Sequence, residues 1–169
     1  KDGKMVTAVK REHRRVENGR EVTVDLGSVG DVGSVDPSLP EALLDLGYIP
    51  VLTCIAQDSE GAEYNINADM FAGHVAGALK ANEYLVLTDV DGLLGDKDDP
   101  GTLLHEISIA EVDQLVREKI IQGGMIPKME SCIIALENGA EAARIINGTK
   151  PEQLIGMMEG IATGTVITK

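Results

Sequence analysis

The sequence predicts an α/β fold, in which an open, mainly parallel sheet with helices on both faces follows an N-terminal β-hairpin. Apolar segments that suit strands alternate with amphipathic segments that suit helices along most of the chain. The apolar segments are not interrupted by alternating polar residues, which is typical of parallel strands buried on both faces. Near the N-terminus, Asn18 and Gly19 stand between two β-rich segments and suit the positive φ angles of a tight hairpin turn.

The length and charge of the chain limit its class. A chain of 169 residues is long enough to bury its own core, so we expect a single domain over residues 1–169. The formal net charge of −13 disfavours binding to nucleic acid or to an anionic membrane surface. No apolar segment approaches the roughly 18 residues of a membrane span. Cys54 and Cys132 suit buried, reduced thiols. We therefore expect a soluble, cytoplasmic protein, and the start at Lys1 within patterned sequence indicates a piece of a longer chain.

The expected elements follow the alternation of apolar and amphipathic segments. Strands are expected at residues 4–16, 20–29, 48–56, 84–87, 141–148 and 164–169, and a turn followed by a short strand is expected within residues 57–65. Helices are expected at residues 38–47, 67–82, 108–120, 127–139 and 151–159. Gly47 and Gly139 stand where helices commonly end, and Ser108 and Glu111 have the spacing of a capping box. The charged segment 95–101 suits an exposed loop.

The first candidate site is the segment "NINAD". Asn65, Asn67 and Asp69 recur at every second residue, so an extended backbone would point their side chains to one side, where two amides and a carboxylate would converge on a ligand. Ordinary helix capping by Asn67 or Asp69 explains two of them equally well. Asn65 stands too early to cap the helix, which favours ligand binding for it.

The second candidate site is the segment "LTDVDGLLGD". Asp89, Asp91 and Gly92 come directly after an apolar strand, and ligands of open α/β sheets bind at the carboxyl ends of strands. A nucleotide or magnesium role and an ordinary polar loop are equally good explanations, since aspartate and glycine are common in such loops. Neither a Walker A loop nor a GxGxxG fingerprint occurs in the chain.

The third candidate site is the segment "GGMIPKME". It places Lys128 at the start of a predicted helix, where the dipole already presents partial positive charge. A solvated surface lysine is the simplest interpretation. An anion is the other, because backbone N–H groups, the flexible Gly123 and Gly124 and the Lys128 ammonium together would suit a phosphoryl group.

Six segments in this order, over essentially the whole chain, resemble the amino acid kinase family: "LGSVGDV", "LLDLGYIPVLTCIA", "YNINADMFAGHVAGAL", "YLVLTDVDGLL", "GGMIPKME" and "GTVI". The family implies a two-lobed α/β protein whose first lobe holds an amino acid and whose second lobe holds the nucleotide. The chain resembles the second, ATP-binding lobe, with residues 1–30 as a hairpin segment facing the substrate lobe. The first lobe, with its glycine-rich loops and a second catalytic lysine, is not part of this sequence.

The resemblance is strongest to members that phosphorylate the side-chain carboxylate of N-acetyl-L-glutamate in arginine biosynthesis. It implies that Asn65, with Asn67 beside it, contacts the amino acid. It further implies that Asp69 orients the catalytic lysines and that Lys128 stabilises the transferring phosphoryl group. The residues expected along the nucleotide are Asp89, Val90, Asp91, Gly92, Leu93, Leu94, Ile120, Ile121, Gln122, Gly123 and Gly124. The implied ligands are ATP with Mg²⁺ and N-acetylglutamate, and no protein metal site is expected.

Several alternatives remain open from the sequence. A related kinase would act on an aminoadipate derivative or on aspartate. The chain could also be an isolated nucleotide-binding module without turnover, or a regulatory or scaffolding domain. The full-length protein is expected to be a homo-oligomer, and this chain alone a monomer, because the amino acid lobe makes the main contact in the family.

Overall fold

The computed structural model describes residues 2–17 and 19–169, which fall into two compact units. Unit 1 ends at Ala72 and unit 2 runs from Gly73 to Lys169. Each described sheet takes all its strands from one unit. The length of the chain predicted a single domain, and the described residues form two units with separate sheets. No described helix has the length and apolar character needed to cross a membrane.

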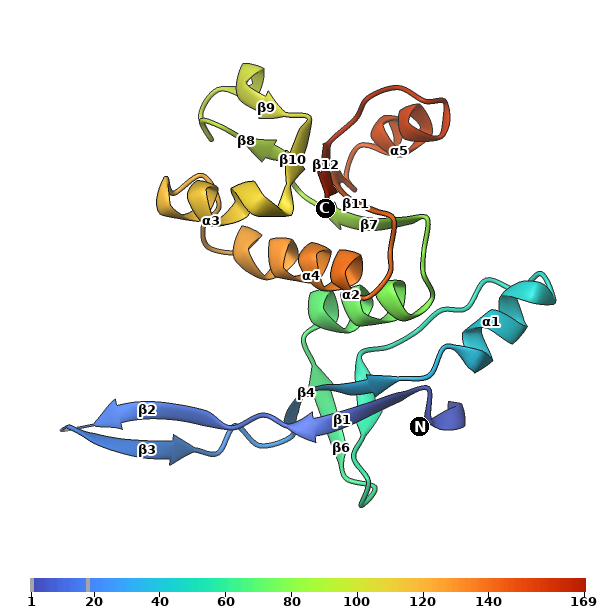
Figure 1. Ribbon diagram of the computed structural model, residues 1–169, viewed down its shortest axis with the longest axis vertical. Coiled ribbons are helices and arrows are strands. Elements are labelled where there is room, and N and C mark those ends of the chain that lie inside the picture. The colour runs from blue at the N-terminus through green and yellow to red at the C-terminus, as the bar shows by residue number, and fades with distance from the viewer. Residues whose placement is uncertain (1, 18) are drawn as a thin grey trace. The chain divides into compact units, whose positions relative to one another are not determined.

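Unit 1 is built around a small closed barrel with the strand order β1-β4-β6-β5 (Figure 1). Its elements are η1 (Asp2–Lys4), β1 (Val6–Lys10), β2 (His13–Glu17), β3 (Arg20–Val24), β4 (Val29–Val35), α1 (Ser38–Asp45), β5 (Ile55–Gln57), β6 (Glu63–Ile66) and the start of α2 (Ala68–Ala78). Val6, Ala8 and Ile66 are buried in the core of this barrel. The barrel was not predicted, because the closing pairs β1–β5 and β4–β6 join segments far apart in the sequence.

The predicted β-hairpin is present, and it is divided into two parts. β1 and β4 pair antiparallel at its base, while β2 and β3 form a separate ribbon that extends away from the barrel (Figure 1). The ribbon turns between Glu17 and Arg20, with Gly19 at a φ of 76°. Asn18, the other predicted turn residue, lies outside the described residues. β2 is exposed along its whole length, as is most of β3.

The predicted buried strand at residues 48–56 is wrong for most of its length. β5 covers only Ile55–Gln57, and Ile49 and Val51 are 88% and 91% exposed. β5 has partners, since it pairs with β6 and with Thr7 of β1. Among the strands described, none pairs with residues 48–53. Apolar composition therefore predicted a strand where the described chain supplies no neighbour.

Unit 2 contains a four-stranded sheet in the order β10-β12-β11-β7. Its elements are β7 (Glu83–Thr88), β8 (Leu93–Leu94), η2 (Pro100–Thr102), β9 (Leu103–Leu104), β10 (Glu106–Ser108), α3 (Ile109–Arg117), α4 (Met125–Glu137), β11 (Ala142–Asn147), α5 (Pro151–Met158) and β12 (Thr165–Thr168). β7 and β11 are parallel, as are β10 and β12, while β11 and β12 are antiparallel. α4 and α5 both contact β11 and are drawn on opposite sides of the sheet in Figure 1. The predicted α/β fold with a mainly parallel sheet is confirmed.

The helices predicted in unit 2 are also confirmed, and two local signals fixed their ends. The capping box at the start of α3 is formed, with the Ser108 N–H donating to Glu111 Oε2 at 2.8 Å. α4 ends at Glu137, and Gly139 follows it with a φ of 128°. The centre of the unit is apolar, and Ile145, Ile146 and Ile167 are fully buried there.

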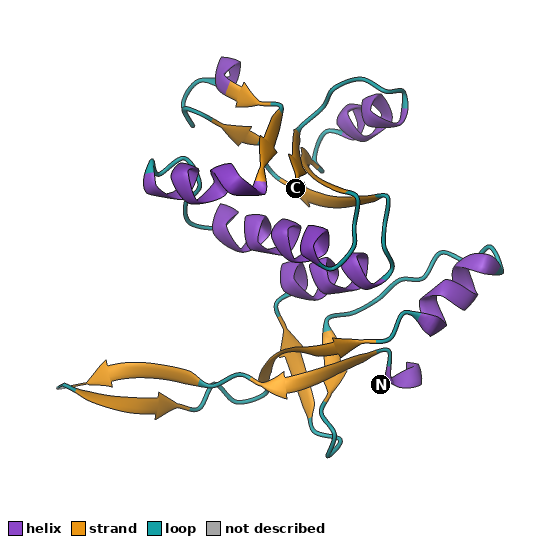
Figure 2. Ribbon diagram, in the orientation of Figure 1, coloured by secondary structure: helices purple, strands orange, loops and turns teal. Residues whose placement is uncertain are grey.

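α2 and α4 approach each other closely in unit 2, through glycines of α2 that lie four residues apart (Figure 2). A Cβ atom added at Gly77 would lie 2.5 Å from Asn138 Cβ and 3.0 Å from the Ala135 carbonyl oxygen. A Cβ atom added at Gly73 would collide with the Ser131 carbonyl. The backbone contact therefore requires glycine at both positions.

Candidate functional site

The carboxyl ends of β7 and β11 lie side by side in unit 2. Their last residues, Thr88 and Asn147, are partners in the parallel register. The loop of residues 89–92 continues from β7 at this edge and leads into β8. This is the edge of a parallel pair where α/β proteins bind ligands, and it is where the second predicted cluster lies.

Asp91 is the most heavily bonded residue of this loop. Its Oδ1 accepts hydrogen bonds from Asn147 Nδ2 at 2.8 Å and from Gln153 Nε2 at 3.0 Å. Its Oδ2 accepts from Lys150 Nζ at 2.7 Å. The Lys150 ammonium, followed by the Asn147 amide, holds the pKa of Asp91 below its ordinary value. Both carboxylate oxygens are thus engaged, by the last residue of β11 and by two residues that follow it.

The end of the loop is fixed by a buried threonine. The Leu93 N–H donates to Thr165 Oγ1 at 2.8 Å, and that hydroxyl donates to the Leu104 carbonyl at 2.6 Å. Gly92 has a φ of 141°, and a Cβ atom there would lie 2.7 Å from Thr165 Oγ1. The Leu93 side chain is buried, whereas Val90 is exposed. Leu93 is one of the residues predicted to bind the nucleotide. Because its side chain is buried, it could contact a ligand only through its backbone.

Lys128 lies in the first turn of α4, as the sequence predicts, and its side chain is partly buried. The turn is tied to β7 by buried hydroxyl groups. Tyr84 of β7 donates to Ser131 Oγ at 3.3 Å, and Ser131 Oγ donates to the Lys128 carbonyl at 2.7 Å. One strand therefore positions both the α4 turn that carries Lys128 and the loop that follows Thr88.

The segment before α4 forms an exposed turn with one buried anchor. Ile121 is 1% exposed, so its side chain belongs to the core. Gln122, Gly123 and Gly124 are exposed, and a Cβ atom at either glycine would meet open space. Gly123 has a φ of 56°, and its carbonyl accepts from the Ile126 N–H at 3.2 Å. The backbone at Gly123 and Gly124 is therefore open to solvent, while the Met125 and Ile126 N–H groups already donate to the Gln122 and Gly123 carbonyls.

The first predicted cluster lies in unit 1. Asn65 is exposed on β6, where Tyr64 and Ile66 on either side of it are buried, so the expected alternation holds. Asn67 Oδ1 accepts from the Met70 N–H at 3.1 Å, so Asn67 caps α2. Asp69 lies within the first turn of α2 and no longer follows the extended spacing.

Cys54, which lies beside Asn65, is less buried than the sequence predicted. Cys54 is only partly buried, and its Sγ lies 3.8 Å from Asn65 Oδ1. Cys132 is buried as expected, and both cysteines are free. The apolar neighbours of Cys54 in the sequence predicted full burial. It ends the segment 48–54, which the barrel leaves largely exposed.

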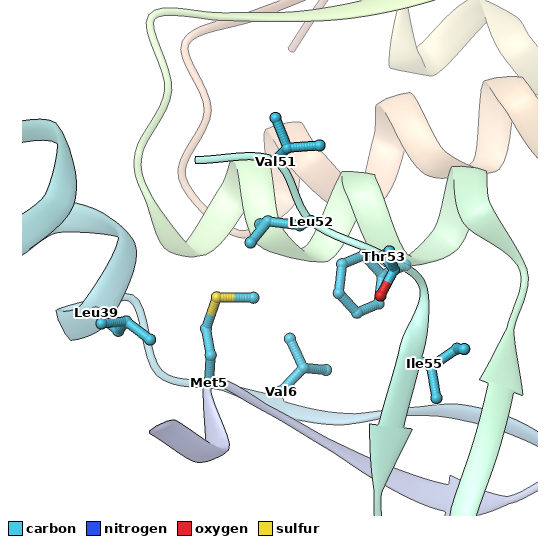
Figure 3. Close-up of a pocket in the computed structure, with 8 residues that line it drawn as sticks. Met5, Val6, Leu39, Val51, Leu52, Thr53 and Ile55 are labelled. Carbon is cyan, nitrogen blue, oxygen red and sulfur yellow. The ribbon is translucent and has the colours of Figure 1, made fainter. Parts of the chain in front are cut away.

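A cavity of about 270 Å³ lies within unit 1, among Met5, Val6, Leu39, Val51, Leu52, Thr53, Ile55 and Phe71 (Figure 3). Its lining carries no charged side chain. Burying a carboxylate or phosphate without a paired charge is costly. This cavity therefore does not fit a nucleotide phosphate or an acidic amino acid.

The residues that sequence reasoning missed hold the loop 89–92 or Leu93, which follows it. They are Asn147, Lys150, Gln153 and Thr165. Asn147 carried a usable signal, since it is the polar residue that ends an apolar strand, and Asp89 follows one directly. Its pairing with Thr88 could not be known before the strand order was known. No group of three or more His, Cys, Asp or Glu side chains in the described ranges is placed to hold a metal ion.

Residues 4–147 match the amino acid kinase family, and the chain belongs to it. Acetylglutamate kinase of Archaeoglobus fulgidus is 43% identical, over 96% of this chain and 57% of that protein. Acetylglutamate kinase of Methanocaldococcus jannaschii is also 43% identical, over the whole of this chain and 57% of that protein. The chain therefore spans little more than half the length of these relatives.

Solved structures share the fold of this chain. The crystal structure of smu.665 from Streptococcus mutans UA159 aligns with a TM-score of 0.71 at 29% identity, over 97% of this chain and 56% of that one. N-acetylglutamate synthase from Neisseria gonorrhoeae, complexed with coenzyme A and L-arginine, aligns with a TM-score of 0.81 at 25% identity, over 99% of this chain and 37% of that one.

Proposed function

We propose that this chain is the nucleotide-binding part of an ATP-dependent kinase that phosphorylates the side-chain carboxylate of N-acetyl-L-glutamate. The observation that carries the proposal is the 43% identity to acetylglutamate kinases over essentially the whole chain. The product would be N-acetylglutamyl 5-phosphate, an intermediate of arginine biosynthesis. The lobe assignment of residues 1–169, with residues 1–30 facing the amino acid lobe, is part of this proposal.

The residues at the start of α4 in unit 2 suit a nucleoside triphosphate. Gly123 and Gly124 leave open space just before α4, and Lys128 adds an ammonium group in the first turn of that helix. A helix start with a lysine suits the charge of a phosphoryl group. The loop of residues 89–92 would lie along the nucleotide, as would the segment 120–122.

Magnesium would reach this site with the nucleotide rather than through a set of protein ligands. Of the two carboxylates in the loop, Asp91 is already occupied by Lys150, Asn147 and Gln153. Asp89 accepts a hydrogen bond from the Thr88 hydroxyl at 3.1 Å and by itself would not make a set of protein ligands. When bound, the ion would neutralise charge on the phosphate oxygens.

The chemistry of the proposed reaction needs positive charge more than a general base. A glutamate side chain has a reference pKa of about 4.3, so the acceptor carboxylate is already ionised at neutral pH. The barrier comes from bringing that anion to a triphosphate, and a fixed ammonium lowers it electrostatically. We assign that role to Lys128. Asn65 and Asn67 would contact the amino acid, and Asp69 would orient the catalytic lysines.

Calorimetric titration of the chain with Mg-ATP, followed by an ADP-release assay of the full-length protein, tests the proposal. We expect the chain to bind Mg-ATP and the full-length protein to release ADP only when N-acetylglutamate is present. Comparable rates with an aminoadipate derivative or aspartate would reassign the acceptor. Failure of the chain to bind Mg-ATP would reject the proposal and favour a regulatory or scaffolding domain.

A second candidate is a nucleotide-binding module without turnover. It is favoured by the coverage of the relatives, since the chain matches only 57% of their length. Mg-ATP binding by the chain without any ADP release, even at high N-acetylglutamate, would support it for the isolated chain. We place the full-length protein in the cytoplasm, as a homo-oligomer, and the isolated chain as a monomer.

A further inference from the structure

Asn147 occupies an unusual place for a polar side chain. It is the last residue of β11, it lies beside Thr88 in the register, and it is 5% exposed. A buried carboxamide costs free energy unless its N–H and C=O groups find partners. The partners of the Asn147 side chain lie in loops that follow β7 and β11, and none of them is a strand residue. The side chain therefore binds loops rather than the sheet.

The two ends of the Asn147 amide bind two different loops. Nδ2 donates to Asp91 Oδ1 at 2.8 Å and to the Asp89 carbonyl at 3.3 Å, both in the loop after β7. Oδ1 accepts from the Thr149 N–H at 3.0 Å and from its hydroxyl at 2.6 Å, in the loop after β11. One side chain thus joins the two loops at the carboxyl edge.

Lys150 and Gln153 complete the arrangement from the same side. Gln153 Oε1 accepts from the Asn147 N–H at 2.9 Å while its Nε2 donates to Asp91, so the glutamine bridges the two residues. Lys150 binds the second oxygen of Asp91. With Leu93 fixed by Thr165, the loop is held at Asp89, at Asp91 and at its end. Val90 remains as an exposed side chain of the held segment.

We propose that Asn147 is a positioning residue that, through Asp91, holds the loop of residues 89–92 in the conformation that receives the nucleotide. This inference rests on the proposed function, since it concerns the same nucleotide site. Asn147 itself need not touch the ligand. Asp91 serves as the anchor of the loop, and Lys150 and Gln153 keep its carboxylate oriented.

An exchange of donor and acceptor tests this role without changing the volume of the side chains. Asn147→Asp removes the Nδ2 donor and sets two carboxylates against each other. Mg-ATP binding by the chain should weaken about tenfold or more, the scale of one lost charge-assisted hydrogen bond. Combining Asn147→Asp with Asp91→Asn restores a donor–acceptor pair between these two positions in the opposite sense. It should recover part of the lost affinity, since the bonds to Gln153 Nε2 and to the Asp89 carbonyl are not restored.

Amide hydrogen exchange of residues 89–93 provides a readout that does not depend on the nucleotide. Exchange should be faster in Asn147→Asp than in the wild type and should slow again in the double variant. Exchange rates and Mg-ATP affinities are compared well below the melting temperature of each variant. A loss of global stability then does not change the measured values. If Asn147→Asp binds Mg-ATP as tightly as the wild type, the positioning role is overturned and the proposed function stands.

Two further outcomes are also decisive. If the wild-type chain binds no Mg-ATP, the proposed function fails, and unchanged amide exchange in Asn147→Asp would overturn the positioning role as well.

If Asn147→Asp does not fold, Lys150→Met replaces it, with Lys97→Met in the exposed loop 95–101 as the matched control. Equal Mg-ATP affinity in those two lysine variants would contradict the proposal, and weaker binding in Lys150→Met alone would support it.

Discussion

Gly92 shows how strictly a single residue of the candidate site is determined. Its φ of 141° is rarely adopted by residues with a side chain, and a Cβ atom would meet Thr165 Oγ1 at 2.7 Å and Leu103 Cδ1 at 2.8 Å. The same threonine hydroxyl accepts the Leu93 N–H. Space and backbone conformation therefore both require glycine at the end of the loop.

Gly92→Ala should lower the free energy of unfolding by about 1–3 kcal/mol, through backbone strain and displacement of Thr165. Urea denaturation measures this loss. The matched control is Gly95→Ala, because a Cβ atom at Gly95 would come no closer than 3.5 Å to its neighbours. Its effect should stay within about 0.5 kcal/mol. Equal stability of the two variants would contradict the described geometry.

Asp91 predicts a pH dependence of stability with a definite sign. Its folded pKa is lowered, first by Lys150 and then by Asn147, so its stabilising effect is present above the unfolded pKa of about 3.9. That effect is lost as the pH falls through the lower, folded pKa. The melting-temperature difference between wild type and Asp91→Asn should therefore be constant near neutral pH and shrink below about pH 4. A difference that does not change with pH down to about pH 2 would refute this.

At the residue scale, the sequence located the loop but not its partners. Asp89, Asp91 and Gly92 could be predicted as residues of the loop, and as candidates for a site, because they follow an apolar strand. Asn147 and Thr165 could not, since their roles depend on which strands are neighbours and on hydrogen bonds across 56 and 72 residues. Asn67 shows the reverse case, because the simple capping interpretation describes the contact that its side chain makes.

At the scale of elements, local signals were reliable where the chain itself supplies the partner. The capping box of Ser108 and Glu111 and the glycine after α4 needed only neighbouring residues, and both helices are found as predicted. The segment 48–56 needed a neighbouring strand, and only its last residues have one. Apolar composition alone does not provide the hydrogen bonds that make a strand.

The contact between α2 and α4 gives a prediction that opposes helix propensity. Alanine is favoured over glycine inside a helix by about 1 kcal/mol, so Gly77→Ala would stabilise α2 in isolation. In unit 2 the added methyl group would lie 2.5 Å from Asn138 Cβ, and we expect a net loss of about 1–3 kcal/mol.

Thermal or urea unfolding measures the Gly77→Ala effect, with Gly156→Ala in α5 as the control. A Cβ atom at Gly156 meets its nearest neighbour, Thr163 Cγ2, at an ordinary 3.4 Å. The control should be neutral or slightly stabilising, following propensity. A stabilised Gly77→Ala variant would mean that the two helices do not approach as described.

At the scale of the whole molecule, the chain carries a formal net charge of −13 and is proposed to act on two anions. The general field of such a protein repels these ligands, so binding must depend on groups fixed at the site. We assign this task to the start of α4 with Lys128, whose turn is held by Tyr84 and Ser131. The central claim is therefore that this ammonium stabilises the transferring phosphoryl group.

The most direct measurement of this claim is the turnover number of the full-length protein with Lys128→Ala. Removing one preorganised electrostatic donor should reduce turnover by about 10²-fold or more. Lys97→Ala, in the exposed loop 95–101, serves as the control and should leave turnover unchanged. Near-normal turnover of Lys128→Ala, in a protein that folds as the wild type does, would contradict the account.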